Sequence, residues 1–172
     1  SQRSSGEERW FALGDQLTDG ATITLCEQEV ELYSNRIFDA GSFTFAVEIG
    51  ESALSPVPVG TQMALQGAEI IVSLAADSDI SGKRNQIIES YKSCSARSIA
   101  GYIYSSCGFG ESTSDVVFSG NAFIAENGTI LAQNRRFAIE NQLTISEIDV
   151  ELLRHKRIKS NTFAAARKDV EN

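Results

Sequence analysis

The sequence has few of the residues that disulfide frameworks, metal centres and membrane spans require. Its 172 residues include three cysteines, one histidine, two prolines and one tryptophan. Cys26, Cys94 and Cys107 form no C-x-x-C pair, so we expect reduced thiols and no metal site. No run of about 18 apolar residues occurs, and no basic segment followed by an apolar one opens the chain. We therefore expect a cytoplasmic location and no membrane partner.

Positive charge is also scarce. The formal net charge is −8 and the isoelectric point is about 4.7, whereas nucleic-acid binding draws much of its affinity from a basic face. We therefore expect no nucleic-acid partner. The basic residues that gather at Arg154–Arg157 and at Lys159 have a simpler interpretation, because cations at the end of a helix complement its dipole. His155, the single histidine, is predicted to be a solvated surface residue.

What is present is the composition of an ordinary globular domain. Apolar residues make up 42% of the chain and charged residues 22%, and the length suits one domain with a real core. Residues 1–160 are predicted to form part of this domain. Residues 161–172 turn polar and are predicted to be a C-terminal arm or linker stub.

In the middle of the chain the predicted strands and helices alternate, as they do in an α/β layer. Thr61 is the predicted cap of a short helix and Gly67 its stop. A longer amphipathic helix then places Ile87, Tyr91 and Cys94 on one face. The predicted order is strand, helix, strand, helix, strand, over residues 43–49, 61–67, 69–74, 83–100 and 102–104.

The flanking segments favour antiparallel pairing. Asn127-Gly128 between the alternating runs 116–125 and 129–133 is a strong hairpin signal. Alternation also predicts a hairpin over residues 21–33 and a strand over residues 143–148. Asp149 is the predicted cap of a helix with an acidic start and a basic end.

Five ordered strings give the sequence a family resemblance. They are E-E-R-W-F at 7–11, E-I-G-E-S-A-L-S-P-V-P at 48–58, Y-I-Y-S-S-C-G-F-G-E-S-T at 102–113, F-I-A-E-N-G-T-I-L-A at 123–132 and D-V-E-L-L-R at 149–154. Together they resemble the glutaminase domain of glutamine-dependent NAD synthetases, a member of the nitrilase, or carbon-nitrogen hydrolase, superfamily. The resemblance implies an α-β-β-α sandwich, of which this chain would form an incomplete one.

The resemblance also places the site. In that family a cysteine attacks the amide, and Gly50 stands at its position here. The family's base glutamate and oxyanion lysine lie upstream of the E-E-R-W-F segment and so outside this chain. Nitrilase-like sites hydrolyse amides in two steps, through a thioester intermediate on the cysteine. Loss of the thiol therefore implies an inactive chain. The glycine fits either a decayed site or a deliberate substitution. The substrate-binding positions that the resemblance implies are Glu51, Asp77, Lys83, Glu111 and Ser112.

The roles of three of these positions are open. Asp77 stands where the family has a small hydroxyl residue, and its added charge puts recognition of the glutamine carboxylate in doubt. Glu111 and Ser112 keep the G-E-S-T motif, which can border the glutamine pocket or serve only to hold a loop by hydrogen bonds from side chains to backbone.

Two other residues are alternative nucleophiles by position. Ser52 follows Gly50 in a G-x-S-x pattern, but Leu54 stands where a serine-hydrolase elbow requires a small residue. Cys107 precedes a glycine-rich loop, and nothing near it in the sequence would lower its pKa. Neither residue is predicted to be catalytic.

The synthetase half of the family is not represented. Its S-G-G-x-D-S phosphate loop does not occur, so we expect no cofactor in this chain, and ATP and magnesium would belong to an absent synthetase domain. The resemblance implies glutamine as the family substrate, the synthetase domain as a partner and a homo-oligomer. The alternative function is a non-catalytic nitrilase-like module that serves assembly or regulation.

Overall fold

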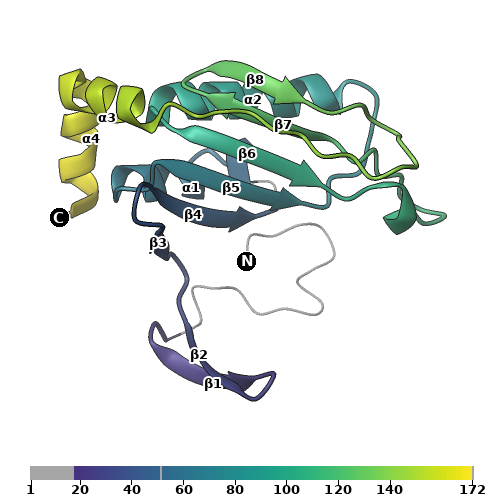
Figure 1. Ribbon diagram of the computed structural model, residues 1–172, viewed down its shortest axis with the longest axis horizontal. Helices are drawn as coiled ribbons and strands as arrows, with labels where there is room; N and C mark the ends of the chain where they lie inside the picture. Colours follow the sequence, from purple (N-terminus) through teal and green to yellow (C-terminus); the bar gives the residue numbers. More distant parts are fainter. Residues whose placement is uncertain (1–17, 51, 172) are drawn as a thin grey trace.

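The fold is built on one six-stranded sheet with two helices packed on one face (Figure 1). The computed structural model describes residues 18–50 and 52–171. The strand order is β3-β4-β5-β6-β7-β8, and a separate two-stranded hairpin, β1-β2, precedes it. The strands are β1 (Ala21–Leu25), β2 (Gln28–Leu32), β3 (Ile37–Asp39), β4 (Thr44–Ile49), β5 (Ile70–Ala75), β6 (Gly101–Ser106), β7 (Ala122–Glu126) and β8 (Thr129–Gln133).

The three central strands are parallel, as their apolar sequences predict. Ile49 pairs with Leu74, and Leu74 pairs with Ser105, so β4, β5 and β6 are adjacent and end at the same edge. The crossovers between them contain α1 (Val59–Leu65) and α2 (Lys83–Ser98), which lie behind the sheet in Figure 1. The predicted alternation of strands and helices is therefore confirmed. Because both crossovers place their helices on one face, that face is buried.

The ends of the two helices differ from the prediction. Pro58, with φ −64°, is the residue before α1, so the predicted cap Thr61 lies inside the helix. The Pro58 carbonyl accepts a hydrogen bond from Thr61 N at 3.1 Å, and the Thr61 hydroxyl accepts one from Ser98 Oγ at 3.3 Å. The longer helix ends at Ser98, before the predicted end, because Ile99 adopts the left-handed conformation with φ 47°.

The predicted Asn-Gly hairpin is confirmed as β7 and β8. Asn127 has φ 44° and Gly128 has φ 90°, the left-handed pair that a tight two-residue hairpin needs. A side chain at Gly128 would also approach Ala96 Cβ to 3.0 Å. The predicted first strand is too long, since β7 begins at Ala122 and residues 116–120 lie in a loop.

The predicted strand over residues 143–148 is wrong. The segment is extended but pairs with no strand among the residues that the structure describes. Ile148 packs against Gly101, whereas Leu143 and Ile145 are 85% and 75% exposed. The alternation is real, but a strand exists only when a neighbour accepts its backbone hydrogen bonds, and alternation cannot report a neighbour.

The chain ends in two helices, α3 (Val150–Lys159) and α4 (Asn161–Glu171), at one end of the sheet (Figure 1). The Asp149 carboxylate accepts a hydrogen bond from Leu152 N at 2.9 Å, which confirms the predicted cap. Phe163 of α4 is buried with Leu153 and Ile99 in a second small core. The segment predicted as an arm or linker stub is thus helical and anchored by one aromatic ring.

The main core lies between the sheet and the two crossover helices. Its centre is aromatic: Tyr91 of α2 lies within 6 Å of the rings of Tyr102, Tyr104 and Phe123. Tyr91 shares a 2.5 Å hydrogen bond with Ser73 of β5, which satisfies a hydroxyl group that would otherwise be buried alone. Within the described residues, no helix is long and apolar enough to cross a membrane.

Candidate functional site at the carboxyl edge of the parallel strands

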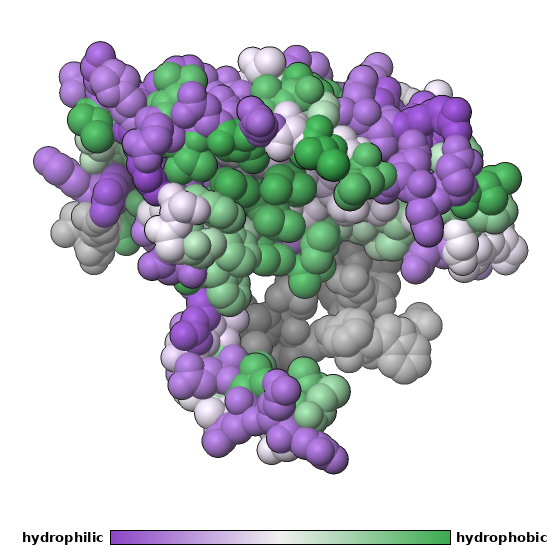
Figure 2. Space-filling view, in the orientation of Figure 1, coloured by the Kyte–Doolittle hydropathy of each residue, from purple (hydrophilic) through white to green (hydrophobic). Residues whose placement is uncertain are grey.

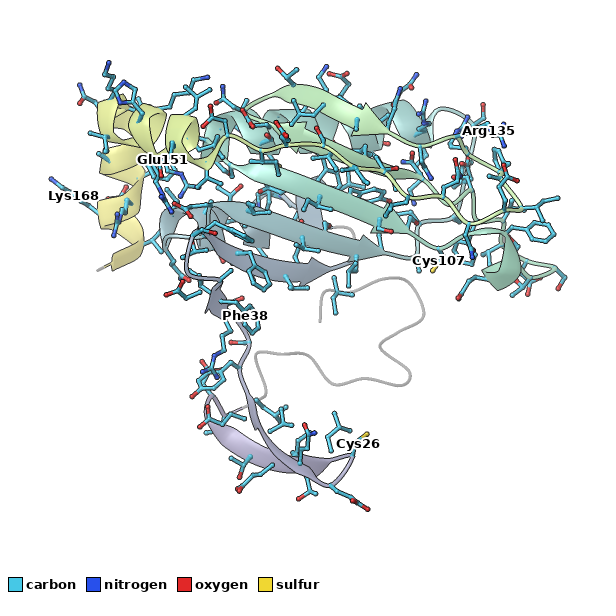
Figure 3. All side chains as sticks on the ribbon, in the orientation of Figure 1. Cys26, Phe38, Cys107, Arg135, Glu151 and Lys168 are labelled. Carbon is cyan, nitrogen blue, oxygen red and sulfur yellow. The ribbon has the colours of Figure 1, made fainter. Side chains whose placement is uncertain are left out.

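The carboxyl ends of β4, β5 and β6 form one edge, and the candidate residues follow these ends. Gly50 follows β4, and its amide donates a hydrogen bond to Leu74 O at 2.9 Å. Cys107 follows β6, and its amide donates to Ala75 O at 3.1 Å (Figure 3). In parallel α/β sheets, ligands bind at this edge. The register therefore gathers the three segments after these strands into one candidate site.

Gly50 has φ +88°, a conformation that favours glycine. The turn that follows β4 therefore carries no side chain at its first residue. Glu51, which was predicted to bind substrate, lies outside the described residues. Farther back on β4, Glu48 is buried, and its Oε2 accepts a hydrogen bond from Gly60 N at 2.9 Å.

Asp77 and Lys83, two predicted substrate-binding residues, are brought together. Lys83 Nζ lies 3.5 Å from Asp77 Oδ1, and both side chains are more than four-fifths buried. The Tyr104 hydroxyl donates a 2.5 Å hydrogen bond to Asp77 Oδ2. The Asp77 amide donates to Ser106 Oγ at 3.2 Å. The Asp77 carboxylate is therefore bound by the protein's own lysine and tyrosine.

The space beside this pair is small. The cavity has a volume of about 10 Å³, which is room for about one water molecule, whereas small-molecule sites usually measure roughly 300–1,000 Å³. The buried Asn121 Oδ1 has no hydrogen-bond partner among the described residues. The lining residues are Asp77, Ser78, Asp79, Lys83, Arg84, Ile87, Tyr104, Ser106, Ser119 and Asn121.

Glu111 and Ser112 lie apart from that cavity, in the loop after β6. Glu111 ends a short 3-10 helix, Phe109–Glu111, and is exposed. Ser112 Oγ accepts a hydrogen bond from Phe118 N at 3.0 Å. For Ser112 this contact matches the loop-holding interpretation, because a hydroxyl oxygen that accepts a backbone amide closes the loop.

Cys107 is half-buried, and its surroundings oppose a thiolate. Burial raises the pKa of its thiol, and the charges of Glu111 and Asp77 raise the pKa further. Since the thiolate is the nucleophile, a raised pKa lowers reactivity. Cys94 lies in the core with its pKa also raised by burial, and Cys26 lies at the exposed hairpin turn (Figure 3).

Sequence reasoning missed three residues that organise the site. Tyr104 and Ser106 bind the Asp77 segment, and Asn121 lines the cavity. Tyr104 lies at an alternate position of β6, so its direction toward the helix side could have been read from the strand pattern. Asn121 directly precedes β7, and no sequence pattern indicated that it would line the cavity. No group of three or more His, Cys, Asp or Glu that could hold a metal occurs among the described residues.

Comparisons with known proteins support the resemblance. The chain is 33% identical over 160 residues, 91% of its length, to the glutamine-dependent NAD(+) synthetase of Mycobacterium bovis. It is 32% identical over 160 residues to the protein of the same name from Mycobacterium leprae. In both cases it spans only 23% of the relative's length. No family model matches the chain.

Solved structures show the same fold. A glutamine-dependent NAD(+) synthetase from Cytophaga hutchinsonii superposes with a TM-score of 0.66 and 19% identity, over 81% of this chain and 22% of that one. A carbon-nitrogen hydrolase from Helicobacter pylori superposes with a TM-score of 0.60 and 17% identity, over 73% of this chain and 46% of that one. The chain is therefore a homologue of part of the glutamine-dependent NAD(+) synthetases, and its fold is similar to part of the carbon-nitrogen hydrolase fold.

Proposed function

We propose that this chain is a glutaminase-domain portion of a glutamine-dependent NAD synthetase in which Gly50 occupies the position of the nucleophile. The observation that carries the proposal is the turn after β4. It follows a parallel strand at the sheet edge where ligands bind, it leaves the sheet at a residue with φ +88°, and that residue has no side chain. A fold suited to amide hydrolysis thus presents no side-chain nucleophile at residue 50.

Glutamine is the proposed family substrate, and we expect this chain to bind it weakly. An amino-acid ligand needs a cation for its carboxylate, and Lys83 lies 3.5 Å from Asp77 instead. The cavity at this pair, about 10 Å³, is also far smaller than glutamine needs. ATP, magnesium and NAD synthesis are assigned to a synthetase domain outside these 172 residues, and a cytoplasmic location is part of the same proposal.

Ammonia release from glutamine tests the proposed inactivity. The chain should release ammonia no faster than a glutamine solution without protein, because Gly50 offers no nucleophile and the pKa of Cys107 is raised. The Cys107→Ser and Ser52→Ala variants should give the same background. Turnover that persists in both variants would contradict the assignment of the site to this edge.

The second candidate function is a non-catalytic assembly or regulatory module. The contacts of Asp77 with Lys83 and Tyr104 favour it, because they hold a polar cluster closed without any ligand. A Gly50→Cys variant separates the two candidates. If the turn keeps the geometry of a nucleophile site, an electrophilic glutamine analogue should alkylate the introduced thiol in preference to that of Cys107, as read by peptide mass spectrometry. Equal labelling of both thiols would favour the non-catalytic module.

A further inference from the structure

The small cavity beside Asp77 has a polar lining. Ile87 alone among its ten described lining residues has no polar side-chain atom, and the volume of about 10 Å³ corresponds to one water-sized sphere. Figure 2 shows a largely hydrophilic surface at this end of the molecule, near Arg135 in Figure 3, and an apolar band over β4, β5 and β6. The cavity is therefore suited to one small polar occupant.

Arg84 brings a buried hydrogen-bond donor to this lining. Its Nη2 donates to Gln133 Oε1 at 3.1 Å, which ties the first turn of α2 to the end of β8. Its Nε is buried and has no hydrogen-bond partner among the described residues. Because native proteins pair the great majority of their buried polar atoms, we expect an acceptor beside this nitrogen.

Asn121 brings a buried acceptor to the same lining. The residue is 5% exposed, and its Oδ1 lacks a partner in the part of the chain that the structure describes. Its backbone is held in place, since Asn121 O accepts a hydrogen bond from Ser106 N at 3.0 Å and Gly120 N donates to Cys107 O at 2.8 Å. These bonds tie the segment to the end of β6, so Oδ1 stays buried.

We propose that this cavity binds one ordered water molecule, which accepts a hydrogen bond from Arg84 Nε and donates one to Asn121 Oδ1. The two buried atoms require an occupant that accepts and donates at once. Ammonium only donates and a halide ion only accepts, whereas water does both and fits the volume. This inference does not depend on the glutaminase assignment.

The charged lining residues also disfavour an ion. The carboxylates of Asp77 and Asp79 oppose an anion, and the cations of Lys83 and Arg84 oppose a cation. Lys83 Nζ already lies 3.5 Å from Asp77 Oδ1. An ion in this cavity would therefore lose its hydration beside a charge of its own sign, and water has no such cost.

The water would join the helix side of the sheet to its last hairpin. Arg84 lies on α2, Asn121 directly precedes β7, and Gln133 of β8 pairs with Phe123 of β7. Contacts from Gln133 through Arg84 and the water to Asn121 would thus tie both strands of the hairpin to α2. Because the cavity has room for about one water, a ligand group that entered it would have to displace that water and replace its two hydrogen bonds.

A crystal structure of the 172-residue chain that resolves ordered solvent tests the proposal directly. We expect one solvent peak within about 2.7–3.2 Å of both Arg84 Nε and Asn121 Oδ1. A crystal soaked in rubidium bromide should give no anomalous peak in the cavity, since both ions of this salt scatter anomalously. A cavity without solvent density, an anomalous peak, or a direct hydrogen bond between Arg84 and Asn121 would overturn the proposal.

Magnetic relaxation dispersion of water oxygen-17 tests the same site in solution, because it counts water molecules that stay bound longer than the protein tumbles. Arg84→Met and Asn121→Leu keep the approximate size of each side chain and remove one partner of the water, so each should lose one long-lived water. The double variant should also lose one. Asn85→Leu is the matched control, since exposed Asn85 lies on the same turn of α2 and should keep the wild-type count.

Thermal unfolding supplies the energetic check. Each single variant should lower the Tm by several degrees, and the second substitution should lower it less in the background of the first, because the water is already lost. If Asn121→Leu does not fold, Arg84→Met decides the question, since Arg84 is partly exposed. An unchanged water count in Arg84→Met, two waters lost in the double variant, or equal loss in Asn85→Leu would each contradict the proposal.

Discussion

The Arg154 guanidinium binds the Glu69 carboxylate with two hydrogen bonds, Nε to Oε1 at 2.5 Å and Nη2 to Oε2 at 3.1 Å, across 85 residues of sequence. Thr44 N donates to the same carboxylate at 2.8 Å, and Arg154 Nη2 donates to Ser42 O at 2.9 Å. One paired carboxylate thus joins α3 to the starts of β4 and β5. Bidentate contacts between an arginine and a carboxylate are among the stronger polar contacts in proteins.

Glu69→Gln should lower stability at neutral pH and lose most of its effect in acid. Burial alone would raise the pKa of Glu69, but hydrogen bonds from Arg154 and Thr44 and the charge of Arg154 hold that pKa below the ordinary 4.5. A lowered folded pKa stabilises the protein above pH 4.5, and this contribution is lost as the pH falls through the folded pKa.

Thermal unfolding at pH 7 and in acid measures this difference, with Glu151→Gln as the control because Glu151 is the exposed partner of the same arginine. The Tm of Glu69→Gln should fall by several degrees at pH 7, and the control should change little. An effect of Glu69→Gln that is the same at both pH values would contradict the linkage.

Arg157→Met should destabilise the fold by about 2 kcal/mol or more, because one buried polar group without a partner costs roughly 1–3 kcal/mol. Arg157 donates to the backbone oxygens of Ile99, Ala68 and Ser98 at 2.9, 2.7 and 3.3 Å. Burial lowers the pKa of its guanidinium to about 10, so it stays charged at neutral pH. Lys159→Met, on the exposed side of the same helix, should be nearly neutral in thermal and urea unfolding.

Gly50→Ala should cost about 1–2 kcal/mol, since a Cβ at positive φ clashes with the backbone. Gly50 has φ +88°. Gly110→Ala is the matched control, because a Cβ there meets nothing within 4 Å. Urea denaturation should rank Gly50→Ala below both the wild type and the control. Equal stability of the two variants would show that the turn after β4 does not require glycine.

Tyr91 and Tyr102 should resist ionisation until the protein unfolds. Burial, and then the charge of Glu48, raises the pKa of both phenols well above 10, and the hydrogen bond with Ser73 only partly offsets the shift for Tyr91. Because the folded pKa is raised, their contribution to stability is full below pH 10 and is lost as the pH rises above it.

Tyrosinate absorbance measured during an alkaline titration should therefore show at least two of the four tyrosines ionising only in the unfolding step. Tyr91→Phe and Tyr102→Phe should each remove one of them. A single smooth step for all four tyrosines in the native protein, without loss of circular dichroism, would contradict the prediction.

The sequence by itself determined the features that depend on neighbouring residues. Apolar runs and helical periodicity predicted the alternation of β4, α1, β5, α2 and β6, and Asn127-Gly128 predicted the final hairpin, because backbone preference and side-chain period are local properties. The ordered strings at 48–58 and 102–113 also pointed to the synthetase relatives, with which the chain shares 33% identity.

The tertiary structure decided what depends on distant partners. Residues 143–148 have the alternation of a strand, yet no described strand lies beside them to accept their hydrogen bonds. Asp77 was predicted to face a substrate, and only the folded chain shows Lys83 and Tyr104 bound to it. Likewise, local pattern cannot tell which apolar face of a sheet is covered, because burial is set by what packs against the face and not by the strand's own residues.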